Sequence, residues 1–278
     1  MSRIASRFAD LKRENRAAFI PFITAGDPDM ETTLALLQEL PAAGADIIEL
    51  GVPFSDPMAD GPAIQASSQR ALNGGMTLHK VLDMVRRFRK SDSKTPLVLM
   101  GYYNPIHAYG TARFVKDAAQ AGVDGLITVD LPPEEDDVLR VPAEAHGLDI
   151  VRLATPTSDD LRLKTIVNGA SGFLYYVSIA GVTGTKSYAE DDVRAAVARI
   201  KAAGGLPTAV GFGIRTPEQA AAIARFADAA VVGSAIVTKM AESGAAGLSR
   251  EALVKDVLKF CTALAQSVHA ARAAPVLG

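Results

Sequence analysis

Eight short apolar runs recur along the chain, and their spacing predicts its architecture. They cover residues 19–23, 46–50, 97–100, 125–129, 150–153, 173–177, 208–212 and 229–232. Runs of this length, rich in branched aliphatic residues, are typical of strands buried on both faces of a parallel sheet. Successive runs begin 21 to 35 residues apart, the length of one strand–helix unit, except for one interval of 51 residues between the second and third runs.

Helix signals lie between these runs. Thr77 precedes an apolar stripe at helical spacing, and this helix, together with one predicted over 62–73, accounts for the long interval. Asp27 before Pro28, Ser158 before two aspartates and Thr216 before Pro217 are typical of residues that cap helix N-termini. A last helix directs its apolar stripe inward, and Cys261 lies within that stripe, which indicates a packing role.

The alternation of strands and helices predicts the fold class. A length of 278 residues is compatible with two lobes or with one large α/β barrel. Because eight strand–helix units follow one another without a linker, we expect a single (β/α)8 TIM barrel domain over residues 1–278. We further expect an N-terminal helix over 1–15, an additional helix between strands 2 and 3, and a frayed tail over 270–278.

Glu49 is a carboxylate inside the second apolar run. Side chains alternate along a strand, so Ile48 and Leu50 are expected to face the helices, while Ile47 and Glu49 face the barrel interior. Catalytic residues of such barrels lie at the C-terminal ends of the strands. The alternative is a structural role, in which Glu49 forms a buried ion pair, for example with Arg152.

Asp60 follows Glu49 by eleven residues, in a loop that prolines at 53, 57 and 62 make stiff. One interpretation is that Asp60 caps the helix after Pro62. If the loop instead folds over the barrel mouth, Glu49 and Asp60 become two carboxylates in different environments, one desolvated and one better hydrated. Such pairs can divide acid and base roles between them.

Two glycine-containing turns are candidates for a phosphate site. Residues 211–214 (GFGI) follow the seventh run, and Gly233–Ser234 follow the eighth. In barrels, backbone N–H groups of the loops after strands 7 and 8 often bind phosphate. The glycine-rich loop 181–186 after the sixth run has the composition of a lid.

Composition narrows the class of function. With 29 Lys and Arg against 31 Asp and Glu, the chain has no overall field for nucleic acid or for an anionic membrane. The N-terminal residues lack the apolar core of a signal peptide, and a single cysteine excludes an internal disulfide, so we expect a cytoplasmic protein. None of the eight runs contains the lysine of a Schiff-base aldolase, and the four histidines show no metal-ligand spacing, so no metal site is expected.

A longer motif carries a family resemblance. Residues 48–62 (IELGVPFSDPMADGP) resemble the signature of the tryptophan synthase alpha subunit, and the likeness covers nearly the whole chain. It includes residues 19–28 (FIPFITAGDP), 103–106 (YNPI), 181–184 (GVTG), 211–214 (GFGI) and 233–237 (GSAIV). Met100 stands where leucine is common in the family, a change that nearly conserves volume.

The resemblance implies a barrel lyase that cleaves indole-3-glycerol phosphate into indole and glyceraldehyde 3-phosphate. Glu49 would be the main acid/base, and Asp60 would hydrogen-bond the indole N–H. The residues that would bind the substrate are Phe22, Met100 and Tyr175 beside the indole, Thr183 in the lid, and Gly184, Phe212, Gly213, Gly233 and Ser234 around the phosphate. Such a retro-aldol cleavage needs no metal or organic cofactor in this chain.

The resemblance also implies a partner, the beta subunit, which carries pyridoxal phosphate and condenses indole with serine. The two would form an alpha2-beta2 heterotetramer that passes indole between them, with Pro53, Asp56, Asn104 and Pro105 of this chain at the interface. The alternatives are another phosphate-binding barrel, such as a sugar-phosphate isomerase or indole-glycerol-phosphate synthase, and a non-catalytic regulatory barrel.

Overall fold

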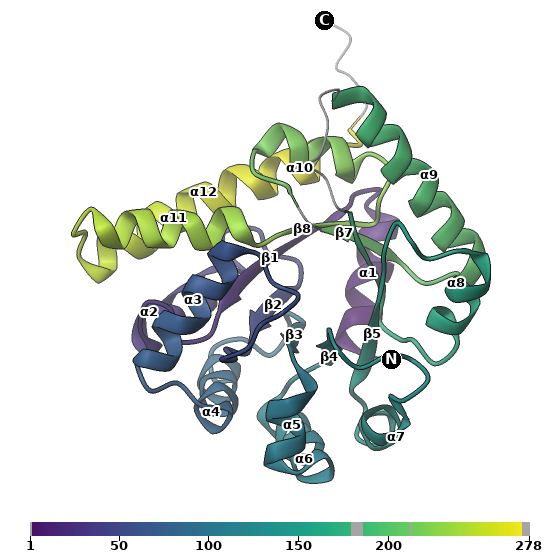
Figure 1. Ribbon diagram of the computed structural model, residues 1–278. Helices are drawn as coiled ribbons and strands as arrows, with labels where there is room; N and C mark the ends of the chain where they lie inside the picture. Colours follow the sequence, from purple (N-terminus) through teal and green to yellow (C-terminus); the bar gives the residue numbers. More distant parts are fainter. Residues whose placement is uncertain (1, 179–185, 212, 274–278) are drawn as a thin grey trace, which may run out of the picture.

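The computed structural model describes residues 2–178, 186–211 and 213–273, and its eight parallel strands close into a barrel in chain order (Figure 1). The strands are β1 Ala18–Thr24, β2 Ile48–Gly51, β3 Leu97–Gly101, β4 Gly125–Thr128, β5 Asp149–Ala154, β6 Leu174–Val177, β7 Thr208–Gly211 and β8 Ala229–Val232. Each overlaps one of the eight apolar runs, so the predicted (β/α)8 barrel is confirmed.

Helices surround this barrel and connect its strands. Those of the described residues are α1 Arg3–Arg13, α2 Met30–Glu39, α3 Pro62–Asn73, α4 Leu78–Arg89, α5 Tyr103–Tyr109, α6 Thr111–Ala121, α7 Asp137–Ala145, α8 Asp160–Val167, α9 Lys186–Gly204, α10 Pro217–Ala224, α11 Ser234–Ala245 and α12 Arg250–Ala270. The predicted pair between β2 and β3 is present as α3 and α4. The short helix α5, which directly follows β3, was not predicted.

Two apolar layers lie on opposite faces of the sheet. Ile48 and Leu50 belong to a cluster between strands and helices, whereas Ile47 and Val98 belong to the cluster inside the barrel, as alternation along the strands predicts. The interior cluster also contains the buried face of α1, namely Ile4, Phe8 and Leu11. The N-terminal helix therefore packs into the barrel and leaves the opposite mouth for chemistry.

Two of the predicted helix caps are wrong. Helix α2 is capped by Asp29, while Asp27 is buried and pairs with Arg70 of α3. Helix α8 is capped by Asp159, and the hydroxyl of Ser158 instead accepts a hydrogen bond from Thr155 N. In both cases the capping aspartate directly precedes the helix, and its carboxylate accepts hydrogen bonds from the free N–H groups of the first turn. The predicted cap at Thr216 is confirmed, and Thr77 caps α4.

Asp46 ties the start of β2 to three other elements. It is 2% exposed and accepts hydrogen bonds from Phe19 N (2.8 Å) and His269 Nε2 (2.9 Å), and it pairs with Arg7 and Arg16. Burial opposes its ionisation, but the hydrogen bonds from His269 and Phe19 and the charge of Arg16 hold the pKa of Asp46 below its usual value. Its ionised form therefore stabilises the fold.

No helix of the described ranges is both long enough and apolar enough to cross a lipid bilayer.

We expect Asp46→Asn to lower the free energy of unfolding by about 3 kcal/mol at pH 7, since it removes a buried carboxylate from the partly buried cations Arg7 and Arg16. Because the pKa is lowered in the folded state, this contribution is present above about pH 4 and is lost as the pH falls through the folded value. Urea denaturation at pH 7 and at pH 3 measures both effects. Asp10→Asn, which removes a half-exposed pair with Arg13, is the control. Equal stability of Asp46→Asn and wild type at pH 7 would contradict this account.

Candidate active site

Glu49 lies in β2 with its side chain in the barrel interior. It pairs in register with Phe22 on β1 and Val98 on β3, is 1% exposed, and its Oε2 has no hydrogen-bond partner among the described residues. Burial, and second the charge of Asp60, raise the pKa of Glu49 from 4.5 to about 8. At neutral pH this carboxyl group is therefore mostly protonated and able to donate a proton.

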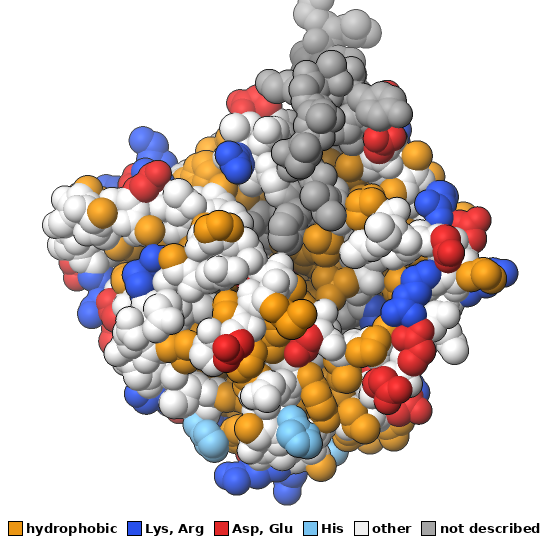
Figure 2. All heavy atoms as spheres, viewed as in Figure 1, with side chains coloured by type: hydrophobic (Ala, Val, Ile, Leu, Met, Phe, Trp, Pro, Cys, Tyr) orange, Lys and Arg blue, Asp and Glu red, His pale blue; other side chains and the backbone are white. Residues whose placement is uncertain are grey.

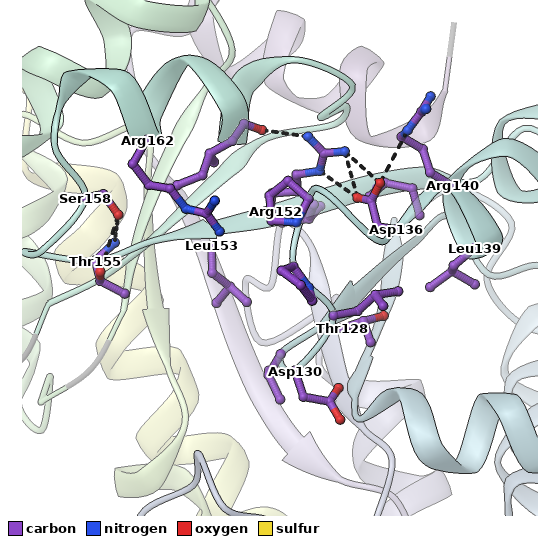
Figure 3. Close-up of a pocket in the computed structure, with 17 residues that line it drawn as sticks. Thr128, Asp130, Asp136, Leu139, Arg140, Arg152, Leu153, Thr155, Ser158 and Arg162 are labelled. Atoms are coloured by element: carbon purple, nitrogen blue, oxygen red, sulfur yellow. Dashed lines mark hydrogen bonds and ion pairs between the residues drawn. The ribbon is translucent and has the colours of Figure 1, made fainter.

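The alternative prediction, an ion pair between Glu49 and Arg152, is wrong. Arg152 Nε and Nη2 donate to both carboxylate oxygens of Asp136, at 2.8 and 2.9 Å, outside the barrel (Figure 3). Arg152 Nη1 bonds backbone carbonyl oxygens of α8, including that of Ile166. The reason is the alternation along β5, which directs Val151 and Leu153 inward and Arg152 outward.

Asp60 lies in the loop between β2 and α3, and it does not cap that helix. Helix α3 begins at Pro62 behind Gly61 and has no side-chain cap, so the capping interpretation is wrong. Asp60 Oδ2 instead accepts a hydrogen bond of 3.0 Å from Tyr102 Oη. Burial raises the pKa of Asp60, and the Tyr102 hydrogen bond opposes that rise. Asp60 is less buried than Glu49, so the two carboxylates differ in environment as expected.

Two aromatic side chains stand beside these carboxylates. Phe22 is 7% exposed and Tyr175 is 5% exposed. Burial, followed by the charges of Glu49 and Asp60, raises the pKa of the Tyr175 hydroxyl well above its usual value, which places Tyr175 close to both. A cavity of about 10 Å³ is bordered by Phe22, Asp60 and Met100. The structure therefore gathers the three predicted indole-binding residues around the carboxylates.

Two glycines that sequence reasoning did not assign to the site make room for these rings. A Cβ on Gly51 would lie 2.4 Å from the Phe22 ring, and one on Gly211 would lie 2.2 Å from the Tyr175 hydroxyl. Atoms cannot approach so closely, so both positions need glycine while the rings stay where they are. Only the three-dimensional contact reveals this role, because in the sequence Gly51 is the end of a strand and Gly211 begins a turn considered for phosphate binding.

The candidate phosphate residues lie at the ends of β7 and β8. Gly233 is the N-cap of α11, and in the described structure no side chain caps that helix, so the N–H groups that begin at Ser234 face outward. Gly213 has φ +81°, a conformation that favours glycine. Thr183, Gly184 and Phe212 lie outside the described residues. Gly213, Gly233 and Ser234 therefore stay candidates for a phosphate site, and the uncapped first turn of α11 is the feature that such sites use.

The four residues predicted to contact a partner lie on two adjacent segments. Asp56 and Asn104 are exposed, Pro105 is partly exposed and Pro53 is buried. Their segments touch through the rings of Phe54 and Tyr102, whose centroids are 5.2 Å apart. Met58 in the first segment is 86% exposed, an unusual position for a large apolar side chain.

A larger cavity of about 420 Å³ lies outside the barrel, between α7, α8 and the ends of β4 and β5 (Figure 3). Its charged walls include Asp136, Arg140, Arg152 and Arg162, which are already paired with one another or with neighbouring carboxylates. Neither Glu49 nor Asp60 lines it. Figure 2 shows hydrophobic side chains gathered near the centre of the mouth. The described residues contain no group of three or more His, Cys, Asp and Glu side chains that could hold a metal.

Comparisons with known proteins agree on one family. Residues 8–269 match the family model described as tryptophan synthase alpha chain. A tryptophan synthase alpha chain of Gluconacetobacter diazotrophicus is 59% identical over 98% of this chain and 100% of its own length. The crystal structure of the alpha subunit from Legionella pneumophila superimposes with a TM-score of 0.89 at 42% identity, covering 96% of this chain and 98% of its own. A tryptophan synthase structure from M. tuberculosis gives 0.85 at 35% identity, with 96% and 99% covered.

The raised pKa of Glu49 predicts that ionisation of this residue lowers the free energy of unfolding as the pH rises. A carboxyl group whose pKa is higher in the folded state loses its favourable contribution as the pH rises from about 4.5 to about 8. Glu49→Gln does not titrate, so its stability relative to wild type should increase by about 2.5 kcal/mol between pH 5 and pH 7. Urea denaturation across this range measures the difference, with Glu39→Gln on the exposed end of α2 as the control. A pH-independent difference would contradict the raised pKa.

Proposed function

Because this chain belongs to the tryptophan synthase alpha chain family and cleaves indole-3-glycerol phosphate to indole and glyceraldehyde 3-phosphate, we propose that Glu49 and Asp60 perform the cleavage. The observation that carries the proposal is a carboxyl group that is protonated at neutral pH, held in an apolar interior beside a second, better hydrated carboxylate. The family match does not favour another phosphate-binding barrel or a regulatory barrel without activity.

Glu49 moves the protons of the reaction. Its protonated carboxyl group donates to the ring carbon of indole that bears the glycerol chain, which creates a positively charged ring. The resulting carboxylate then accepts the proton of the adjacent glycerol hydroxyl while the carbon–carbon bond breaks and its electron pair returns to the ring. Indole and an aldehyde leave, and Glu49 is again protonated. A pKa of about 8 suits a group that must both give and take a proton near neutral pH.

Asp60 stabilises the charge that develops on the ring. An ionised carboxylate that accepts a hydrogen bond from the indole N–H favours the positively charged intermediate over the neutral substrate. The hydrogen bond from Tyr102 supports the ionised form of Asp60, while Glu49 has no such donor among the described residues. The difference in hydrogen bonding therefore suits the two carboxylates to different roles.

The other predicted residues bind the substrate at its two ends. Phe22, Met100 and Tyr175 would flank the indole ring, since they surround the carboxylates. Gly213, Gly233 and Ser234 would hold the phosphate through backbone N–H groups, with the positive end of the α11 dipole directed at it. The family resemblance adds Thr183, Gly184 and Phe212 to these sets.

We also propose that this chain passes indole to a beta subunit that carries pyridoxal phosphate, in an alpha2-beta2 heterotetramer in the cytoplasm. Asp56, Asn104 and Pro105 lie on adjoining segments at the mouth, and the exposed Met58 between them supports an apolar contact there. Pro53 is buried, so it would shape this loop rather than touch the partner. The buried thiol of Cys261, the single cysteine, suits a reducing compartment.

The test of the proposed chemistry is indole release from indole-3-glycerol phosphate by the full chain, alone and with a beta subunit. Glu49→Gln should reduce kcat at least about 1,000-fold because it removes the proton donor and acceptor, while calorimetry still detects binding of the substrate. Asp60→Asn should reduce kcat about 100-fold, since the amide stabilises the charged ring less well. Glu39→Gln serves as a control that should keep wild-type activity.

Two results would count against this assignment. Retained turnover in Glu49→Gln would move the acid/base role to another residue. An unchanged rate in Asp60→Asn would remove Asp60 from the chemistry and leave it a structural part of the loop.

A further inference from the structure

Tyr102 connects the loop of Asp60 to the neighbouring strand. It follows β3 directly, precedes the first turn of α5, and is 4% exposed. Its ring packs against Phe54 of the Asp60 loop, and the N–H of the next residue, Tyr103, donates to Asp130 Oδ1 at 2.8 Å. The backbone and the ring of Tyr102 are therefore both fixed, which leaves its hydroxyl in a defined place.

The hydrogen bonds of that hydroxyl have a defined direction. Ala59 N donates to Tyr102 Oη at 3.0 Å, and Tyr102 Oη lies 3.0 Å from Asp60 Oδ2. Since a backbone N–H can only donate, the hydroxyl oxygen is the acceptor there, and its own hydrogen is directed at Asp60. One side chain thus binds both the backbone and the carboxylate of the loop.

We propose that Tyr102 is a positioning residue for the cleavage of indole-3-glycerol phosphate. Its hydroxyl holds the Asp60 carboxylate toward the cavity between Phe22 and Met100, where it meets the ring N–H of the substrate. Tyr102 acts through Asp60, so the inference rests on the role proposed for Asp60 above. No role for Tyr102 was predicted from the sequence, although functional residues of such barrels occur where it lies, at the end of a strand.

The electrostatic surroundings make this hydrogen bond important for the charge of Asp60. In the described part of the chain, the titratable groups that interact with Asp60 are Glu49 from β2, Tyr102 after β3 and Tyr175 from β6. None of these three is a cation. Burial raises the pKa of Asp60, and the Tyr102 hydroxyl lowers it. Removal of the hydroxyl therefore favours the protonated form of Asp60, which cannot stabilise a positively charged ring.

The experiment compares Tyr102→Phe with Tyr103→Phe in the full chain without a partner. Tyr103 is the adjacent residue, and its hydroxyl bonds Thr111 at 3.0 Å, away from Asp60. The measurement is kcat and KM for indole release as a function of pH. Tyr102→Phe should lower kcat about 10- to 100-fold, the loss of one hydrogen bond to a charged group, while KM changes less than about threefold. The acidic limb of its pH profile should move to higher pH, whereas Tyr103→Phe should match wild type.

A second comparison separates positioning from a general loss of structure. In an Asp60→Asn background the hydroxyl no longer supports a carboxylate, so adding Tyr102→Phe should change kcat little further. If Tyr102→Phe does not fold, 3-fluorotyrosine at position 102 keeps the ring and hydroxyl but makes the hydroxyl a more acidic donor. The acidic limb should then move to lower pH.

The outcomes distinguish this inference from the proposed function. If wild type releases no indole, the proposed function fails. If wild type is active but Tyr102→Phe keeps its kcat and its acidic limb, Tyr102 does not position Asp60. The inference would also be overturned if, in the double variant, Asp60→Asn and Tyr102→Phe each lowered kcat by as much as they do alone.

Discussion

The carboxyl group of Glu49 lies within an apolar barrel with one oxygen unpartnered in the described structure, and the chemistry of the site depends on that placement. Water would stabilise the ionised form by several kcal/mol, and Arg152, the cation that the sequence suggested as a partner, faces outward and pairs with Asp136 instead. The group therefore retains its proton at neutral pH. The N-terminal helix contributes to this environment, since Ile4, Phe8 and Leu11 fill the barrel from the end opposite the mouth.

The second carboxylate obtains a different environment from a loop. Asp60 is partly exposed and accepts a hydrogen bond from Tyr102, which opposes the rise that burial causes in its pKa, so two chemically similar groups at one site have different environments. Close packing of the rings of Phe22 and Tyr175 requires glycine at 51 and 211, and the phosphate site proposed at the ends of β7 and β8 would use backbone donors. No net positive charge is needed for that site, which agrees with the nearly neutral composition of the chain.

The sequence predicted the barrel and the inward direction of Glu49, because both follow from strand spacing and alternation along one element. It predicted less where a side chain chooses between partners distant in the sequence. Arg152 was a candidate partner for Glu49 and pairs with Asp136, and Asp60 was a candidate helix cap and bonds Tyr102, 42 residues away. The roles of Gly51 and Gly211 depend on contacts with rings from other strands. Such interactions are set by the three-dimensional arrangement of several elements, which no local pattern encodes.

The central claim is that Glu49 is protonated at neutral pH because its environment is apolar. The most direct test is a carbon-13 NMR titration of the glutamate side-chain carboxyl groups in the ligand-free full chain, with Glu49→Gln used to assign the signal. Because its surroundings raise the pKa of Glu49, we expect this carboxyl group to titrate with a midpoint of about 8. A midpoint near 4.5, the ordinary value for glutamate, would contradict it.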